Sequence, residues 1–550
     1  MATIGGTRGP IVAGSLDLFV RNATGLVRSW AAFDAFIYSF FSINLVTLGW
    51  FQFTYGPGIA PGGNLLTAIV ISGLLILAEV AVYAGLIAVM PRAGGDYVWQ
   101  TRILGGGLGF VLAITGWVFT LWLWVPIYGQ IFSTEFISPM CTILASITGN
   151  HTFVDWAINS LSHTGYLISS IVVSVFAAAV IAAGMKVYAK VQKFCFYGGM
   201  LGLAVMLIML LVNSHADFVN GFNHFNQKIF GVKGAYQATL AAAAKAGYTP
   251  VPFNKLALGG SFALIPVVIF FNLYPNWGAT LYGEVRGAND FKRNLQSMAL
   301  ALIVTTALAL ISLILIAKVT TDTFYNDASQ TFWAGTGSLP VWPYPGLLVS
   351  FLTTNSILQL FLILSLSLWF WGWCGTVFLS STRVIFAAAF DRVLPSWAAT
   401  VNRGVPTNAL LAMVIPGLAL SVLYSYNIWQ FQTVILDAVL VIAVTFFGSA
   451  LVAVVLPWRQ KRLYDQSPIA KYNIAGIPMI SVCGAILLGF LGWSIWMWLY
   501  NSSYGVNNQT SLKFLAALYV IAMVIYIVSR YVNNQRGVNL NTIHKEIPIE

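Results

Sequence analysis

The chain has 550 residues and a formal net charge of +11; 58% of its residues are hydrophobic and only 8% are charged. Soluble domains carry about 25% charged residues, so a soluble protein of this composition could not bury its apolar side chains. The composition excludes a soluble protein and indicates a polytopic membrane protein. Such a protein is one bundle in lipid, and the usual relation between chain length and domain number does not apply to it.

The basic excess has two readings, an anionic partner or a topological signal. Lys and Arg gather in cytoplasmic loops because they orient the transmembrane spans. We assign most of the excess to topology and expect no nucleic-acid partner. The four cysteines show no CxxC or Cys/His ligand spacing, so the sequence predicts neither a disulfide framework nor a metal site. They are Cys141, Cys195, Cys374 and Cys483.

Long apolar runs predict an all-α fold of twelve transmembrane helices. The eighth run is long, and we expect it to continue into the cytoplasm. The predicted spans are 31–54, 64–90, 106–134, 166–186, 194–213, 259–283, 295–318, 355–389, 406–425, 433–456, 477–500 and 512–530.

The distribution of basic residues predicts the orientation. With residues 1–30 as a cytoplasmic segment, all but six of the 27 Lys and Arg fall on the cytoplasmic side. An even number of spans then places the tail, 531–550, in the cytoplasm as well. We therefore expect a multi-pass protein of the cell membrane with both termini inside. The six exceptions are Lys228, Lys233, Lys245, Lys255, Lys318 and Lys513.

Two long segments, 135–165 and 214–258, fall on the outer side. Segments of that length usually carry a function or their own short structure. The stretch from Tyr236 to Gly247, YQATLAAAAKAG, predicts a short helix that caps the outer mouth. Asp34 and Glu135, at the ends of spans 1 and 3, are expected at the membrane interface.

The first and sixth spans share a pattern that predicts interrupted helices. The first contains FFSINLVTLGW, and the sixth contains FFNLYPNWGAT. Pro275 lacks an N–H, and Asn272 and Asn276 place amides at membrane depth. Broken helices of this kind mark substrate sites in secondary transporters, because irregular backbone is tolerated only against protein or water. The alternative is a simple proline kink.

The two spans run in opposite directions, which predicts an inverted repeat. Residues 31–213 (helices 1–5) and 259–456 (helices 6–10) would be two halves related by a pseudo-two-fold axis in the membrane plane. Residues 214–258 would be an extracellular loop between the halves. Residues 457–530 would supply two appended helices, 11 and 12.

Three motifs add a family resemblance. MPRAGGDYVW follows span 2, LYGEVRGANDFKRN follows span 6, and STRVIFAAAFDRVLPSWAATVNRGVPTNALL follows span 8. In this order they resemble the amino acid–polyamine–organocation permeases over spans 1 to 10. The resemblance implies a five-plus-five inverted-repeat bundle with broken helices 1 and 6, and alternating-access transport of amino acids or related amines.

The resemblance also implies a substrate site at the two breaks. The unwound part of span 1 would run from about Ser42 to Thr47. The chain departs from the family's usual Gly-x-Gly break there, and in span 6 it has Tyr274-Pro275-Asn276 in place of Gly-Phe-Asp. The site residues in span 6 would be Phe271, Asn272, Leu273, Tyr274 and Asn276.

A site built from backbone dipoles suits a zwitterion. Free N–H groups at a half-helix N-terminus bind a carboxylate, and unwound carbonyls bind an ammonium. We expect the carbonyls of Phe271 to Tyr274 to bind the amine, and the side chains of Asn44, Asn272, Tyr274 and Asn276 to adjust specificity. The alternative for each amide is a helix–helix hydrogen bond. The carboxylate would bind the N–H groups of Ile43, Asn44, Leu45, Val46 and Thr47.

The sequence does not distinguish H⁺ from Na⁺ as the coupling ion. Glu79 and Asp437 lie within apolar spans, where a charged carboxylate costs about 3 kcal/mol. Either could carry a coupling proton or be a neutral structural carboxyl. Ser365 and Ser367, midway along span 8, could contact sodium or serve helix packing.

Competing functions have less support. No pair of histidines shows HExxH spacing, so we expect no enzyme, no catalytic residue and no cofactor. Nothing in the sequence indicates the selectivity filter of a channel. A substrate sensor on the same fold stays possible. A polyamine or organic-cation carrier is the main rival, but its cavity would need acidic groups, and only Glu79 and Asp437 are available.

Overall fold

A computed structural model describes residues 26, 28–248, 251–402, 404–434 and 437–547. Most of the predicted N-terminal segment, 1–30, lies outside these residues. The described part of the chain is mostly helical, and its one small antiparallel sheet consists of β1 (Asn473–Ile474) and β2 (Ile477–Pro478). Within it, twelve helices are long and apolar enough to cross a membrane.

Spans 1 to 5 form the first half of the bundle. Span 1 consists of α1 (Ala32–Ile43), the π-helical turn η1 (Leu45–Gly49) and α2 (Trp50–Ile59); span 2 is α3 (Leu65–Val89). Span 3 consists of α5 (Gly106–Ile114), η2 (Thr115–Phe119), α6 (Thr120–Phe132), η3 (Ser133–Ile137) and α7 (Ser138–Thr148). Spans 4 and 5 are α9 (His163–Ala182) and α10 (Met185–Val212).

Spans 6 to 10 form the second half, and two more helices follow. Span 6 consists of α13 (Leu258–Asn272) and the 3₁₀ helix η4 (Trp277–Glu284); span 7 is α14 (Phe291–Thr320). Span 8 is divided into α17 (Ser356–Trp373) and α18 (Thr376–Phe390). Spans 9 to 12 are α19 (Thr407–Ser425), α20 (Asp437–Arg459), α22 (Met479–Tyr500) and α23 (Gln509–Gln535).

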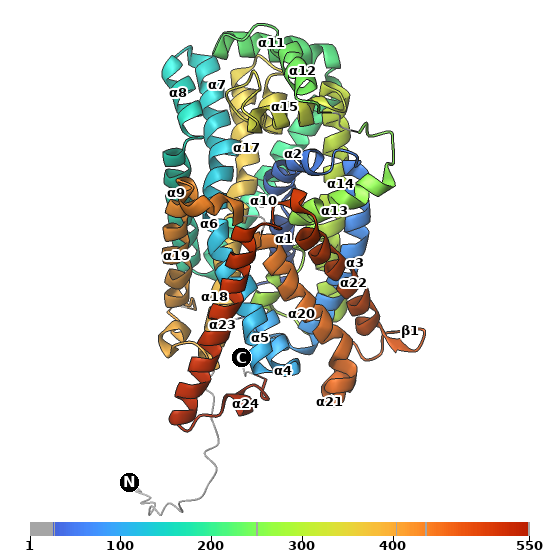
Figure 1. Cartoon of the computed structure of the whole chain (residues 1–550), viewed down its shortest axis with the longest axis vertical. Coiled ribbons are helices and arrows are strands. Elements are labelled where there is room, and N and C mark those ends of the chain that lie inside the picture. Colours follow the sequence, from blue (N-terminus) through green and yellow to red (C-terminus); the bar gives the residue numbers. More distant parts are fainter. Residues whose placement is uncertain (1–25, 27, 249–250, 403, 435–436, 548–550) are drawn as a thin grey trace, which may run out of the picture.

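Short elements cover the two ends of the bundle. The capped end carries α8 (His151–Asn159), α11 (His215–Phe230), α12 (Ala235–Lys245), α15 (Phe324–Trp333) and α16 (Pro345–Ser350). The termini end, at the bottom of Figure 1, carries α4 (Asp96–Ile103), η5 (Ser396–Ala399), α21 (Lys461–Asp465) and α24 (Leu540–Ile543). The 3₁₀ helices η6 (Ile428–Val434) and η7 (Ser502–Tyr504) join spans 9 to 10 and 11 to 12.

Polar side chains at the helix starts fix the span boundaries. Asn64 accepts a hydrogen bond from the Thr67 N–H, Asp290 accepts one from the Arg293 N–H, and Asn355 accepts from the first turn of α17. These caps satisfy N–H groups that have no partner inside the helix. Asn or Asp therefore begins the helices of spans 2, 7 and 8 at the point where their apolar runs start.

Burial separates an inner from an outer set of spans. About 83% of the most apolar window of span 1 is buried, whereas only 28% of that of span 12 is buried. Spans 3, 6 and 10 resemble span 1 in burial, and spans 4, 5, 7, 9 and 11 resemble span 12. The broken helices 1 and 6 thus lie inside the bundle, and the apolar faces of the outer spans are left for lipid.

The predicted fold class is confirmed: twelve spans with interruptions in the first and the sixth. The predicted capping helix is also present, as α12, where Tyr236 stacks on Phe324 at 4.5 Å between ring centroids. Two helices are longer than predicted, and that of span 5 begins at Met185 rather than at residue 194. The helix of span 3 continues beyond residue 134 to Thr148, so Glu135 lies within this helix and is buried in the protein.

Candidate functional site

The break in span 1 is sharper than predicted. Only Asn44 leaves the helical conformation, with φ 44° and ψ 85°, and Leu45 to Gly49 continue as a π-helical turn. Asparagine tolerates this left-handed region better than most residues. Its side-chain oxygen accepts from the Thr47 N–H at 3.1 Å, and its amide nitrogen donates to the Trp369 carbonyl at 3.1 Å. A single residue therefore both breaks span 1 and fastens it to span 8.

The break leaves free donors at the start of the second half-helix. Among the described residues, no hydrogen bond joins the N–H groups of Leu45 and Val46 to another group. Both residues are fully buried. An unpaired buried N–H is costly unless a ligand or water accepts from it. These two N–H groups are therefore the part of the predicted Ile43–Thr47 stretch best suited to a carboxylate.

The break in span 6 lies between α13 and η4. Leu273 ends α13, and Tyr274 to Asn276 form a turn before the 3₁₀ helix. Asn272 donates to the Ser72 hydroxyl at 2.8 Å and so fixes the end of α13 to α3. In the described chain the Tyr274 hydroxyl and the Asn276 amide have no hydrogen-bond partner although both are buried.

A small central cavity lies where the broken spans meet spans 3 and 8. Its volume is about 10 Å³, enough for about one water molecule. Of the ten predicted substrate-binding residues, only Tyr274 lines it. Phe271 instead packs against Phe53 at 5.2 Å. The central cavity is lined by Ser42, Leu48, Trp124, Tyr274, Trp277, Trp373 and Val377.

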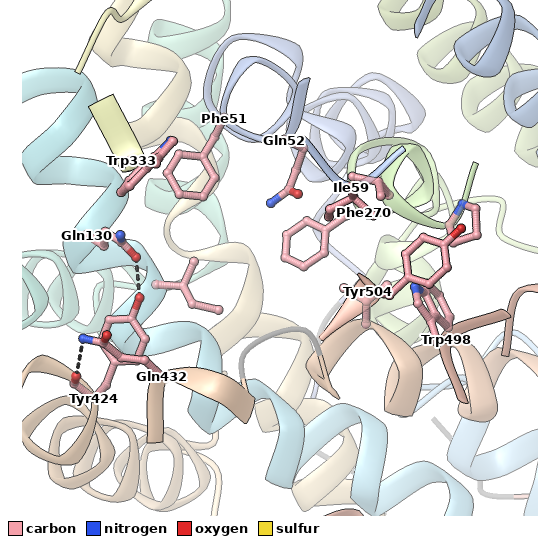
Figure 2. A pocket seen from close by; sticks show the side chains of 14 residues that line it. Phe51, Gln52, Ile59, Gln130, Phe270, Trp333, Tyr424, Gln432, Trp498 and Tyr504 are labelled. Atoms are coloured by element: carbon pink, nitrogen blue, oxygen red, sulfur yellow. Dashed lines mark hydrogen bonds between the residues drawn. The ribbon is translucent and has the colours of Figure 1, made fainter. Parts of the chain in front are cut away.

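A larger cavity of about 340 Å³ lies toward the capped end (Figure 2). We call it the capped-end cavity. The Tyr424 hydroxyl donates to Gln130, and Gln432 donates to the Tyr424 carbonyl at 3.0 Å. It is lined by Phe51, Gln52, Ile59, Ile127, Gln130, Pro266, Val267, Phe270, Trp333, Tyr424, Gln432, Val439, Trp498 and Tyr504, none of them charged.

Two aromatic rings separate the two cavities. Phe270 lines the capped-end cavity, Trp124 lines the central cavity, and their ring centroids are 5.1 Å apart. A solute that enters from the capped end meets this pair first.

Buried charge closes the termini end. Arg383, fully buried in α18, donates to both carboxylate oxygens of Glu284 at 2.7 and 3.2 Å. Trp30 forms a backbone bridge with Val285, directly after Glu284. The Gly94 N–H donates to the Thr280 carbonyl at 2.9 Å. These contacts join the segment before span 1, the loop after span 2 and spans 6 and 8 into one closed layer.

A second ion pair strengthens the same layer. Arg102 in α4 binds both oxygens of Asp391 at 2.5 and 2.9 Å, and Tyr97 donates to Asp391 at 3.0 Å. The pair ties the loop after span 2 to the end of span 8. Arg383 and Asp391 belong to the motif that follows span 8, and the motif therefore serves closure in this conformation.

The predicted coupling carboxyls lie in different places. Glu79 is fully buried in α3, with no hydrogen bond to either oxygen from the described residues, and it interacts electrostatically with Asp96 and Tyr274. It therefore lies near the break in span 6. Asp437 begins α20 close to Ser511 of α23, away from both breaks in sequence and in element.

Asp96, in the connector α4, is held by three donors. The Tyr83 hydroxyl, the Ser449 hydroxyl and the Trp117 indole N–H donate to its carboxylate. Burial raises the pKa of Asp96 to about 6 against these three hydrogen bonds, which lower it. Asp96 and Glu79 are thus two neighbouring buried carboxyls, one with donors and one without.

Ser365 and Ser367, the two predicted sodium ligands, form hydrogen bonds within their own helix, α17. The Ser365 hydroxyl donates to the Leu362 carbonyl, and Ser367 donates to Leu364. A side chain at Gly202 of α10 would collide with Ser365, so span 8 packs closely on span 5 here. Asn44 makes one of the contacts between spans 1 and 8, to the Trp369 carbonyl, and Tyr38 makes another, to the Thr376 carbonyl. No cluster of three or more His, Cys, Asp or Glu side chains suited to a metal ion occurs in the described chain.

Sequence reasoning missed Glu135 and most of the aromatic lining. Glu135 is buried near Thr47 of the span 1 break, and neither its Oε1 atom nor the Thr47 hydroxyl has a hydrogen-bond partner among the described residues. Glu135 lies in the π-helical turn η3, and no local sequence pattern predicts this turn. Trp124 of span 3 and Trp373 of span 8 line the central cavity, and no sequence pattern connects them.

Comparison with known proteins gives one result. A family model described as amino acid permease matches residues 33–528. The match covers all twelve spans apart from their outermost residues. No curated protein matches the chain.

Proposed function

The chain belongs to the amino acid permease family, and on that premise we propose that it is a secondary transporter that moves neutral amino acids by alternating access. The family is one of transporters of amino acids or related compounds rather than of enzymes. The observation that carries the proposal is the pair of breaks at Asn44 and at Tyr274-Pro275-Asn276, which lie in the buried spans 1 and 6.

Access from one side supports alternating access. The capped-end cavity stops at Trp124 and Phe270, and the layer of Arg383, Glu284 and Trp30 closes the opposite end. This is the arrangement of a carrier that faces one side of the membrane. The positive-inside rule assigns the capped end to the outside and both termini to the cytoplasm.

The lining supports a substrate without net charge. Neither cavity is lined by Asp, Glu, Lys or Arg. The N–H groups of Leu45 and Val46 are available to a carboxylate, and the carbonyl end of α13 lies opposite for an amine. A polyamine would need several exposed acidic groups, so a polyamine carrier is the weaker alternative.

Proton coupling through Glu79 is the coupling mechanism we propose. A fully buried carboxyl without a donor or a cationic partner is stable only when protonated. Glu79 interacts with Tyr274 at the break, so its proton and a substrate can influence each other. The alternative, sodium at Ser365 and Ser367, has no contact to span 1 to support it.

Uptake into reconstituted vesicles tests the proposal. Vesicles would be given a panel of radiolabelled amino acids, with either a proton or a sodium gradient imposed. We expect saturable accumulation of neutral amino acids driven by the proton gradient. Binding without accumulation would indicate a sensor on the same fold, and accumulation of polyamines alone would establish the rival carrier.

Matched variants connect the transport to the breaks. Asn44→Ala removes the hydrogen bond from span 1 to the Trp369 carbonyl of span 8, and we expect it to lower the uptake rate at least tenfold. Asn226→Ala is the control, because Asn226 is equally buried but bonds only the Phe222 carbonyl within α11. Equal loss in both variants would contradict a special role for the break.

A further inference from the structure

Four aromatic side chains surround the central cavity. Each ring stands nearly at right angles to the next when they are taken in the order Trp373, Trp124, Tyr274 and Trp277. Trp373 and Trp124 have ring centroids 5.9 Å apart and planes at 81°. Trp124 and Tyr274 are 6.2 Å apart at 87°, and Tyr274 and Trp277 are 5.1 Å apart at 83°. All four line the same cavity. We call these four residues the aromatic box.

Contacts outside the cavity hold the walls in place. Trp277 donates its indole N–H to the Thr376 carbonyl at 3.3 Å and contacts Trp117 at 4.6 Å. Trp373 contacts Tyr128 at 4.4 Å and 85°. The orientations of these rings are thus set by packing from three spans.

The face of an aromatic ring carries negative potential, and several faces around one point attract a cation. A primary ammonium also needs acceptors for its three N–H groups, and aromatic faces supply none of full strength. An N-methylated ammonium has fewer or no N–H groups and loses little by leaving water. Aromatic boxes therefore favour methylated ammonium groups over primary ones.

The box also presents donors for an anionic group. Among the described residues, the Trp124 indole N–H and the Tyr274 hydroxyl have no hydrogen-bond partner, although both side chains are only 2% exposed. Leu48 of the box lining follows the free N–H groups of Leu45 and Val46 in η1. A ligand with a cation and a carboxylate would satisfy both features.

We propose that the central cavity binds the N-methylated ammonium of a zwitterion, so that the preferred ligand is a betaine or an N-methylated amino acid. Its physiological role rests on the transport function proposed above, but the binding itself does not. The cavity holds about 10 Å³ in this conformation, so the box must widen before a ligand fits, and Trp124, which also contacts Phe270, is the wall that we expect to move.

A methylation series tests the binding directly. The purified full-length protein is titrated by isothermal calorimetry with glycine, sarcosine, N,N-dimethylglycine and glycine betaine. We expect the affinity to rise with each methyl group, by tenfold or more over the series. Constant or falling affinity, or no binding by any member, would overturn the proposal.

An uncharged analogue separates cation–π attraction from apolar contact. In 3,3-dimethylbutanoate a carbon replaces the quaternary nitrogen of glycine betaine, with the same shape and carboxylate. We expect it to bind at least tenfold more weakly than glycine betaine. Equal binding would show that the box recognises shape alone, and would contradict the cation.

Variants locate the ligand. Trp124→Leu should weaken glycine betaine binding about tenfold, and Trp124→Phe should restore most of the affinity because a ring face returns. Trp371→Leu is the matched control, since Trp371 lies in the same helix as Trp373 but packs against Phe132 and Phe176. The same comparison at Trp277 decides the matter if Trp124→Leu melts at a lower temperature than the native protein.

The outcomes distinguish this proposal from the transport function. Betaine binding without uptake would refute transport and leave the box intact. Uptake of unmethylated amino acids with no gain from methylation would refute the box and leave the transporter intact.

Discussion

The two ends of the bundle are closed by different chemistry. At the capped end, neutral groups surround a cavity of about 340 Å³, and the hydrogen bonds that cross it join Tyr424 to Gln130 and Gln432. At the termini end, buried ion pairs join Glu284 to Arg383 and Asp391 to Arg102. Neutral contacts can open singly at modest cost, whereas a buried ion pair must separate completely into water. The termini end is therefore expected to open in one cooperative step.

The largest expected effect comes from removing one partner of the buried ion pair between Glu284 and Arg383. Glu284→Gln leaves the fully buried Arg383 without its counter-charge, which should destabilise the conformation closed at the termini end by about 3–5 kcal/mol. We expect a lower melting temperature in detergent and faster thiol labelling of a cysteine placed at Ala279. An unchanged melting temperature and unchanged labelling would contradict the role of the pair.

The pair between Lys193 and Asp34 provides the control. Its N–O distance is 2.7 Å, as short as that of Arg383 and Glu284, but the Lys193 side chain is 41% exposed. Exposed pairs contribute about 1 kcal/mol or less. Lys193→Gln should therefore change the melting temperature little.

The next effect depends on pH. The pKa of Asp96, raised by burial to about 6, lies above the value of about 3.9 in an unfolded chain. The folded state therefore favours the protonated form, and this contribution is fully present below about pH 4 and is lost as the pH rises through 6. Two pKa units correspond to about 3 kcal/mol.

Melting temperatures between pH 4 and pH 8 measure this contribution. The native protein should lose stability over that interval, and Asp96→Asn should lose markedly less. A native protein that becomes more stable as the pH rises through 6, relative to Asp96→Asn, would contradict the shift.

A variant of Glu79, the carboxyl that neighbours Asp96, tests whether uptake is coupled to protons. Glu79→Gln should abolish the stimulation of uptake by a proton gradient while Asp437→Asn retains it, because only Glu79 lies near the span 6 break. The opposite result would transfer the coupling proton to Asp437.

Substitutions of Asn44 are expected to lower the stability by a smaller amount. Two variants separate the loss of its hydrogen bonds from the backbone strain. Asn44→Gly keeps the left-handed backbone without strain but loses two side-chain hydrogen bonds, about 1 kcal/mol each. Asn44→Ala loses the same bonds and adds about 1 kcal/mol of strain. Thermal melting should rank native above Gly and Gly above Ala. If Ala were as stable as Gly, the positive φ of 44° would be in doubt.

The smallest effect is expected at the capped end. Tyr424→Phe removes the hydrogen bond to Gln130 and should change substrate affinity only a few-fold, since a neutral hydrogen bond contributes about 1 kcal/mol. Equilibrium binding measures it. An effect as large as that of Glu284→Gln would erase the difference between the two ends.

Much of the fold follows from the sequence because lipid imposes strict rules. The length of each apolar run predicts a span. Pro275, close to Asn272 and Asn276, predicts the break in span 6. Burial of Glu79 within span 2 was also expected, and its exposed fraction is zero. These features are local, so each can be inferred from a short stretch of residues.

The site itself depends on distant residues, and there prediction was weaker. The aromatic box brings together Trp124 of span 3, Trp373 of span 8 and two residues of span 6, and no periodicity links them. The span 1 break was predicted over Ser42 to Thr47, but the side chain of Asn44 caps the turn and confines it to one residue. Glu135 was missed because the π-helical turn η3 extends a span whose apolar run had ended.

Reciprocal accessibility of the two ends is the most direct test of the account. Single cysteines at Gln432 and Ala279, with Cys141, Cys195, Cys374 and Cys483 replaced, would be labelled by a membrane-impermeant thiol reagent in sealed vesicles of known orientation. If the two ends open in turn, a transported substrate lowers labelling at 432 and raises it at 279. Labelling that changes in the same direction at both positions, or at neither, would contradict a carrier that opens its two ends in turn.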